Sequence, residues 1–256
     1  MPSCQSISRA KLVGYLDDYL EISSIPDRSV NGLQVEGKSR IVRAAFAVDA
    51  CLETIRASAR RRMDILIVHH GILWGRNERI TGVMKNRVAA LIENKMSLYA
   101  AHLPLDCHEE VGNNAQMARL LGFELGVRFA DYHGVQIGYL AETRRTLTRA
   151  ELVRRIEKTL KTRVEVLTFG PPKIKRIGIV SGEAAGFAAE ARDLGCDAFL
   201  TGETSHTAYH LAKEARINVI YGGHYATETL GIKALADHLR REFSLECRFI
   251  PAPTGY

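Results

Sequence analysis

Short apolar runs alternate with amphipathic stretches along the chain, which is the pattern of β-α units. In the first half, the pattern predicts strands at Ile41–Val48, Asp64–Val68 and Ser97–His102, and helices at Leu52–Arg62, Thr81–Asn94 and Asn113–Leu121. The stretch Asp64–Val68 is continuously apolar after its first residue, as expected of a strand buried on both faces of a parallel sheet. Gly122 directly follows the third helix, where a glycine commonly forms the C-cap.

A second series of the same kind follows. It predicts strands at Val135–Leu140, Arg163–Thr168, Ile174–Val180, Ala198–Thr201, Asn218–Tyr221 and Glu246–Ile250, and helices at Thr148–Leu160, Ala184–Leu194, Thr207–Ala215 and Ala226–Glu242. We therefore expect an α/β fold of two lobes with mixed or parallel sheets. The first lobe is predicted to span residues 1–128 and the second residues 129–224, with a switch near Phe129–Gly134. Residues 225–256 are expected to pack back onto the first lobe.

Composition is that of an ordinary globular chain, with 256 residues, 46% hydrophobic and 25% charged. The net charge of +6 is below what a dedicated nucleic-acid binder would show, so nucleic acid is not the expected partner. It favours an anionic or nucleotide-like small-molecule substrate. The stretch Arg144–Arg163 is rich in Lys and Arg, but Glu151 and Glu157 lie among them at helical spacing, which favours a solvated helix face.

Five cysteines at positions 4, 51, 107, 196 and 247 lie far apart and form no C-x-x-C pair. Neither a disulfide framework nor a zinc ribbon is indicated, and a reducing compartment is the simplest interpretation. The first residues lack the pattern of a secretory signal, and no apolar run approaches the ~18 residues of a membrane span. We expect a cytoplasmic protein with no membrane partner.

Two adjacent histidines, His69 and His70, end the predicted strand at Asp64–Val68 and precede Gly71. Ligands of α/β proteins bind at the carboxyl ends of strands. Neighbouring strand residues point to opposite faces, so the two imidazoles cannot both fill the core without polar partners. The pair therefore indicates a functional site.

A second cluster of polar residues, His102 and Asp106, follows the strand at Ser97–His102. Asp106 offers a hard oxygen ligand, and it stands too far upstream to be an obvious cap for the helix at Asn113–Leu121. His102 suits either a hydrogen-bonding group behind a ligand or a solvent-facing residue, and the sequence leaves both open.

The third cluster follows the predicted strand Asn218–Tyr221. After two glycines, His224 and Glu228 stand four residues apart and therefore share one helical face. An exposed ion pair would show the same spacing, but paired glycines permit the close backbone approach that a site needs.

Together the three clusters supply three imidazoles and two carboxylates. This donor set suits zinc, iron or manganese. Five ligands exceed the needs of one tetrahedral zinc, and a carboxylate can bridge, so the sequence predicts two divalent ions about 3.5–4 Å apart. Glu203, His102 and His206 are candidates for proton transfer, although the residues around 204 also suit a plain helix N-cap.

Five short motifs that occur in order along the chain make it similar to the Nif-three-like family, whose members are described as GTP cyclohydrolase I type 2 homologues. The motifs are Asn31-Gly32-Leu33-Gln34-Val35, His69-His70-Gly71, His102-Leu103-Pro104-Leu105-Asp106, Thr201-Gly202-Glu203, and the segment from Gly222 to Glu228. The resemblance implies a dinuclear centre ligated by His69, His70, Asp106, His224 and Glu228, with Glu228 bridging. It further implies two α/β lobes with the metals in the cleft between them, and a toroidal homohexamer.

Three functions compete on this evidence. A metal-dependent hydrolase would use a water acidified by the two ions. A non-catalytic metal-binding or regulatory protein would bind metal without turnover. Nucleic-acid binding through Arg144–Arg163 would show steeply salt-dependent affinity.

Overall fold

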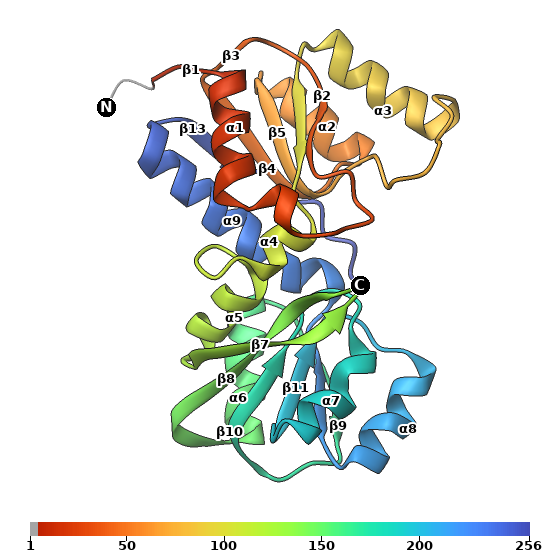
Figure 1. Ribbon diagram of the computed structural model, residues 1–256, viewed down its shortest axis with the longest axis vertical. Coiled ribbons are helices and arrows are strands. Elements are labelled where there is room, and N and C mark those ends of the chain that lie inside the picture. The colour runs from red at the N-terminus through yellow and green to blue at the C-terminus, as the bar shows by residue number, and fades with distance from the viewer. Residues whose placement is uncertain (1–4) are drawn as a thin grey trace. The chain divides into compact units, whose positions relative to one another are not determined.

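The computed structural model describes residues 5–256 and divides the chain into two units, each an α/β structure with its own sheet (Figure 1). Unit 1 comprises Met1–Leu105 and Ile232–Ala252, and unit 2 comprises Asp106–Gly231 and Pro253–Tyr256. The predicted lobe boundary at residues 128 and 129 falls inside a strand of unit 2, whereas the chain first passes from unit 1 to unit 2 after Leu105.

Unit 1 is built on a five-stranded mixed sheet of order β13-β4-β5-β6-β2. The four strands β13, β4, β5 and β6 are mutually parallel, and β2 joins the edge antiparallel to β6. The elements are β1 (Ile7–Ser8), α1 (Arg9–Tyr19), η1 (Ile22–Ser24), β2 (Gly32–Val35), β3 (Arg40–Ile41), β4 (Arg43–Asp49), α2 (Leu52–Arg60), β5 (Ile65–His70), α3 (Gly82–Glu93), β6 (Ser97–Ala100) and β13 (Glu246–Phe249).

Unit 2 is built on a six-stranded mixed sheet of order β7-β8-β10-β11-β12-β9, in which only β10, β11 and β12 run parallel. The elements are α5 (Asn113–Leu121), β7 (Glu124–Tyr132), β8 (Val135–Thr148), α6 (Arg149–Leu160), β9 (Glu165–Thr168), β10 (Lys173–Ile179), η2 (Ala185–Phe187), α7 (Ala188–Asp193), β11 (Ala198–Thr201), α8 (His206–Ala215) and β12 (Asn218–Tyr221). Two further helices, α4 (Leu103–Cys107) and α9 (His224–Phe243), each contribute residues to both units.

Each sheet carries its own hydrophobic core. In unit 1, alternate residues of β5 such as Leu66 and Val68 pack with Ile55 of α2 and Leu91 of α3. In unit 2, Leu152 and Ile156 of α6 pack with Ile177 of β10 and Leu200 of β11. The strand β5 is buried on both faces, as its apolar sequence predicts.

Local sequence signals set several helix ends. Gly122 closes α5 in the left-handed conformation with φ of 82°, which confirms the predicted C-cap. Thr148 and Glu151 form a reciprocal capping box at the start of α6. This box holds the pKa of Glu151 at about 2, because the backbone amide and hydroxyl of Thr148 stabilise its carboxylate.

The long β7–β8 hairpin is the main departure from the predicted elements. The predicted strand Val135–Leu140 is too short, because β8 continues to Thr148 by pairing with β10, and β7 was not predicted. His133 and Gly134 have φ of 55° and 87°, as a tight hairpin turn of this twist requires. The basic stretch Arg144–Arg163 is therefore strand as far as Thr148 and helix only from Arg149, so its prediction as one helix face is wrong for its first residues.

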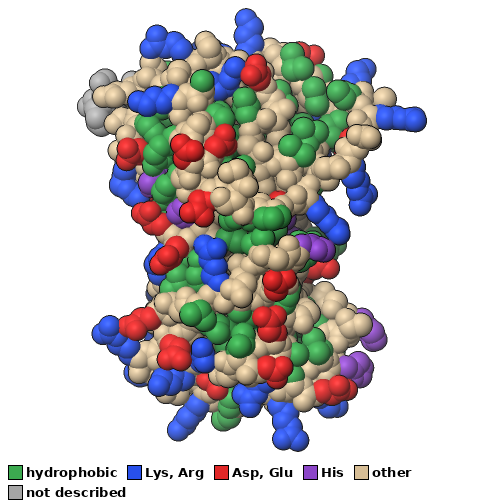
Figure 2. Space-filling view, in the orientation of Figure 1, with side chains coloured by type: hydrophobic (Ala, Val, Ile, Leu, Met, Phe, Trp, Pro, Cys, Tyr) green, Lys and Arg blue, Asp and Glu red, His purple; other side chains and the backbone are tan. Residues whose placement is uncertain are grey.

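The charge distribution, the cysteines and the helix hydropathy can be compared with the sequence-based expectations. Positive and negative side chains are interspersed over the face shown in Figure 2, which carries no extended patch of one sign. Cys51, Cys107, Cys196 and Cys247 form no disulfide within the described residues, and Cys4 lies outside them. Among residues 5–256, no helix has both the length and the apolar character needed to cross a bilayer.

Candidate metal centre

Three imidazoles of unit 1 form a compact cluster at the carboxyl ends of neighbouring strands. His69 and His70 end β5, and His102 follows β6. Their ring centroids lie 4.7–5.5 Å apart. One ring nitrogen from each lies within 4.8 Å of the others, so the three side chains can hold a metal ion together. The structure thus brings His102 into the same cluster as two of the predicted ligands.

Each of these rings has its Nδ1 atom fixed by an oxygen acceptor. Nδ1 of His69 lies 3.0 Å from the carbonyl oxygen of Ala101. A carbonyl can only accept, so Nδ1 carries the proton and Nε2 becomes the ligating atom of the neutral ring. Nδ1 of His70 likewise donates to the Asp49 carboxylate at 2.9 Å. Outer acceptors of this kind orient a ligating histidine and increase its basicity.

Asp27 is the acceptor that orients His102. Its two carboxylate oxygens lie 3.0 and 3.1 Å from Nδ1 of His102, and it also accepts from the side chain of Asn31 and the backbone of Leu103. Burial raises the pKa of Asp27, but its hydrogen bonds and the nearby His102 outweigh that effect and lower it to about 2. The carboxylate is therefore a fixed negative charge behind the imidazole.

Motifs far apart in the sequence form one support for this cluster. Asn31 accepts a hydrogen bond from the backbone of His102 at 2.8 Å, and Gln34 accepts one from the backbone of Ile72 at 2.7 Å. A β-carbon on Gly71 would lie 2.3 Å from the side-chain amide of Gln34. Residue 71 must therefore be glycine for Gln34 to reach the segment after β5.

Trp74 lies beside the imidazoles. Its ring centroid is 5.1 Å from that of His102 and 5.9 Å from that of His70, and its indole N–H donates to the carbonyl of Gly71. This is the only tryptophan in the chain.

In unit 2, His224 and Glu228 open helix α9 and lie against the loop after β10. Nε2 of His224 is 3.1 Å from Oε1 of Glu228, and Nδ1 of His224 is 2.5 Å from Oε1 of Glu203. Burial lowers the pKa of His224, but the two carboxylates favour the charged ring and raise the pKa to about 9. Without metal, the site thus attracts a positive charge.

Because residue 182 is glycine, the loop after β10 can lie close to the Glu228 carboxylate. Gly182 has φ of 65°, and a β-carbon there would lie 2.5 Å from Oε1 of Glu228. Its backbone N–H donates to Thr227, and its carbonyl accepts from the backbone of Gly202 and Glu203. Hydrogen bonds therefore join the loop after β10 to the segment at Gly202 and to the start of α9.

Asp106, also in unit 2, is buried and held in a hydrogen-bonded network. Its Oδ1 atom accepts from the side chains of Asn113 and Ser181, each at 2.8 Å. Asn113 in turn accepts from the backbone of Gly231 in α9. These hydrogen bonds hold the Asp106 carboxylate in one orientation.

Within each unit, the structure brings sequence-based candidates together. His69, His70 and His102 gather in unit 1. In unit 2, His224 contacts Glu228 and Glu203, and Asp106 is hydrogen-bonded to Asn113 and Ser181. His206 is exposed on α8, where its ring lies 6.3 Å from that of His210. Sequence reasoning missed Asp27, Asp49 and Trp74. Asp49 had a usable signal, because it ends β4, the strand next to β5.

Comparison with known proteins identifies the family. Residues 7–254 match the model of Duf34/NIF3 (NGG1p interacting factor 3). The chain belongs to this family. It is 46% identical over 250 residues to a GTP cyclohydrolase 1 type 2 homolog of Pyrococcus abyssi, covering 97% of this chain and 100% of the relative. The corresponding protein of Archaeoglobus fulgidus is 43% identical over 246 residues, covering 96% of this chain and 98% of the relative.

Solved structures of the Duf34/NIF3 family share the fold. The structure of ybgI, a protein of unknown function, superposes with a TM-score of 0.92 at 33% identity and covers 98% of this chain and 100% of its own. TTHA1606 from Thermus thermophilus gives a TM-score of 0.88 at 40% identity, also over 98% and 100%. The family resemblance and the α/β fold expected from the sequence are confirmed.

Proposed function

We propose that the protein binds two divalent metal ions through His69, His70, Asp106, His224 and Glu228 and uses them to hydrolyse a small-molecule substrate. The observation that carries the proposal is the imidazole cluster of unit 1, in which acceptors fix Nδ1 of each ring. With Nδ1 held by an acceptor, each ring offers Nε2 as the ligating atom, and one ring nitrogen from each lies within 4.8 Å of the others. The names of the relatives, GTP cyclohydrolase 1 type 2 homologs, agree with hydrolytic chemistry.

The unit 2 residues fit the same ligand set. The pair formed by His224 and Glu228 attracts positive charge, and a divalent cation would satisfy both side chains where a proton does so in its absence. As the family resemblance implies, Glu228 would be the carboxylate that holds both ions. Imidazole and carboxylate donors without thiolate fit zinc, iron or manganese.

The remaining polar residues receive supporting roles. Bound divalent ions would supply Lewis acidity and lower the pKa of water towards neutrality. Because Asp27 holds Nδ1 of His102, that ring presents Nε2 either for proton transfer or as a further ligand. Glu203 holds Nδ1 of His224 and is a positioning residue in this scheme. A proton-transfer role for His206 stays a prediction.

The first test is the metal content of anaerobically purified protein, measured by plasma mass spectrometry. We expect about two ions per chain in the wild type. We expect a marked loss in His69→Ala and His224→Ala, and no loss in His133→Asn, which alters an exposed histidine of the β7–β8 turn. Metal content that is low in the wild type after reconstitution, or unchanged in both alanine variants, would refute the ligand assignment.

Hydrolysis is tested separately on the metal-loaded protein with a panel of nucleotides, phosphoesters and cyclic amides. Turnover that Glu228→Gln abolishes, with the fold retained, would support the hydrolase. Bound metal without turnover across the panel would instead identify a non-catalytic metal-binding protein.

The family resemblance also leads us to propose a homohexamer. Six chains of 28.4 kDa would give a particle of six times that mass, which light scattering after size-exclusion chromatography resolves from the monomer. A monomer at micromolar concentration would rule the hexamer out.

A further inference from the structure

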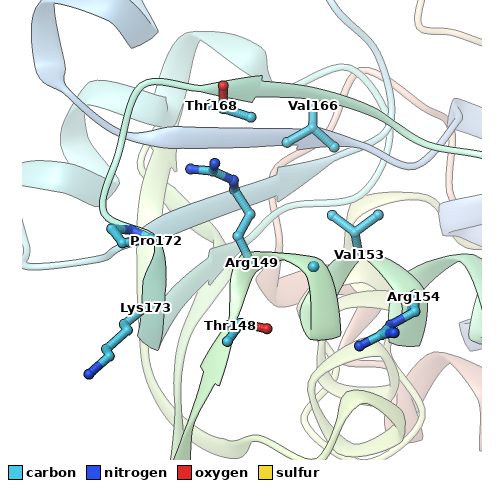
Figure 3. Close-up of a pocket in the computed structure, with 9 residues that line it drawn as sticks. Thr148, Arg149, Val153, Arg154, Val166, Thr168, Pro172 and Lys173 are labelled. Atoms are coloured by element: carbon cyan, nitrogen blue, oxygen red, sulfur yellow. The ribbon is translucent and has the colours of Figure 1, made fainter.

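A groove in unit 2 shares no residue with the candidate metal ligands. It has a volume of about 680 Å³ and lies between the start of α6, strand β9 and the start of β10 (Figure 3). Its lining is mainly apolar and includes Ala150 and Val153 of α6, Val166 of β9 and Pro172. An apolar groove of this size can take side chains of a bound segment.

Three cations border the groove. Arg149 reaches from the start of α6 towards the strand that carries Val166 and Thr168, while Arg154 and Lys173 lie on either side (Figure 3). The Arg149 guanidinium donates to the side chain of Asn218 at 3.1 Å, so it is held in place. Arg154 and Lys173 form no ion pair within the described part of the chain. The rim therefore favours an anionic partner.

Nearby carboxylates do not cancel this charge. Glu151 is occupied by the capping box of Thr148 and by an ion pair with Arg145. Glu165 neighbours Val166 on β9, and successive strand residues point to opposite faces, so its carboxylate is directed away from the groove.

Strand β9 is also an edge of the six-stranded sheet. In the described residues it pairs with β12 alone, as an antiparallel partner. An edge strand offers unpaired backbone N–H and C=O groups on its outer side, which an extended peptide can join. Val166 and Thr168 then share the face on which the peptide's alternate side chains would enter the groove.

The lining distinguishes a peptide from nucleic acid. Single-stranded nucleic acid binds by stacking its bases on aromatic rings, and none of the lining residues is aromatic. Aliphatic side chains with flanking cations instead suit an aliphatic residue between acidic ones.

We propose that this groove binds an extended acidic peptide that pairs with the free edge of β9. One aliphatic side chain of the peptide occupies the floor formed by Val153 and Val166. Acidic side chains on the same face of the peptide contact the cations at the rim.

The test uses the full-length protein and a fluorescein-labelled peptide containing Glu-Thr-Val-Thr-Glu, in which Glu, Val and Glu share one face of a strand. Fluorescence anisotropy measures its binding at low salt. Matched peptides replace both Glu by Lys, or the Val by Ser. A labelled oligothymidylate tests the nucleic-acid alternative.

Two double variants separate local from overall charge. Arg154→Glu with Lys173→Glu reverses the rim, and Lys161→Glu with Arg163→Glu reverses two exposed cations that do not line the groove. Both lower the net charge by the same amount. We expect the rim variant to weaken peptide binding at least about tenfold, because it replaces attraction by repulsion. The control should change it by less than about twofold, as expected of exposed charges.

Supporting results are binding of the acidic Val peptide, weaker binding of both matched peptides and selective loss in the rim variant, with unchanged thermal unfolding. The proposal is wrong if the acidic peptide does not bind, if the two double variants lose affinity equally, or if oligothymidylate binds more tightly than the peptide.

Discussion

Nδ1 of His70 donates a hydrogen bond to Oδ1 of Asp49 at 2.9 Å, and the two residues are partners in the register of β4 and β5. The sheet itself therefore places a carboxylate behind a candidate metal ligand. The contact fixes the tautomer in which Nε2 of His70 accepts the metal.

Replacing Asp49 should weaken metal binding without unfolding the protein. We expect Asp49→Asn to lower affinity about 10–100-fold, as is typical when a carboxylate behind a ligating histidine is lost. Competition with a chromophoric chelator measures the effect. Asp18→Asn, at an exposed position of α1, is the control and should match the wild type. Equal affinities for Asp49→Asn and the wild type would show that His70 does not depend on this contact.

Gly182 and Gly134 form a matched pair for testing the space around Glu228. Both have positive φ, but a β-carbon on Gly134 meets nothing within 4 Å, whereas one on Gly182 lies 2.5 Å from Glu228 Oε1. Alanine should cost each position about 1–2 kcal/mol of backbone strain. Only Gly182→Ala should also displace Glu228 and reduce metal content. Similar metal content in the two variants, measured by plasma mass spectrometry, would argue against Glu228 as a ligand.

Asp64 should make a pH-dependent contribution to stability that is independent of metal. Its carboxylate accepts from Lys38 Nζ at 2.7 Å and from the backbone of Val42 and Arg43 at 3.0 Å each. Burial raises its pKa, but these hydrogen bonds outweigh burial and lower the pKa below the ordinary 3.8. The stabilisation is therefore present above the unfolded-state pKa and lost as pH falls through the folded-state pKa.

Urea unfolding of the chelator-treated protein tests this. We expect Asp64→Asn to lower the free energy of unfolding by about 2 kcal/mol at pH 7, with a smaller difference under acidic conditions. Lys38→Met should cost less, because Lys38 is 41% exposed and solvent screens its charge. A difference between wild type and Asp64→Asn that stays constant down to pH 2 would contradict the assignment.

Trp74 provides a built-in probe of the imidazole cluster, since all tryptophan emission comes from this one residue. Co²⁺ added to metal-free protein should quench the emission saturably if the ion binds beside the ring. His70→Ala should abolish the saturable quenching, and His133→Asn should retain it. Quenching that only grows linearly with Co²⁺ would indicate collisions in solution.

Periodicity and turn chemistry predicted the regular elements where burial alone decides them. Strand β5, the α5 helix with its Gly122 cap, and α6 with Glu151 in its first turn follow from residues close in sequence. The β7–β8 hairpin does not follow from neighbouring residues. Residues 141–148 are strand because they pair with β7 and β10, and no local pattern specifies that pairing.

The candidate site shows the same division. His69 and His70 stand out because polar residues end an apolar strand. Asp27 does not, since it lies 75 residues before His102 and only the folded chain brings its carboxylate to that ring. No spacing rule links a site to supporting residues in distant segments, so a single sequence does not reveal them.

The close contact between Gly71 and Gln34 restricts which substitutions can be accepted at position 71 during evolution. The Gln34 amide occupies the space where any other residue at 71 would place its β-carbon. A smaller residue at position 34 would remove that obstacle and lose the hydrogen bond from Ile72, but the new β-carbon would still lie 2.7 Å from the β-carbon of Ala100. A side chain at position 71 thus requires that positions 34 and 100 both make room, so we expect glycine to persist at 71 wherever Gln34 and Ala100 are kept.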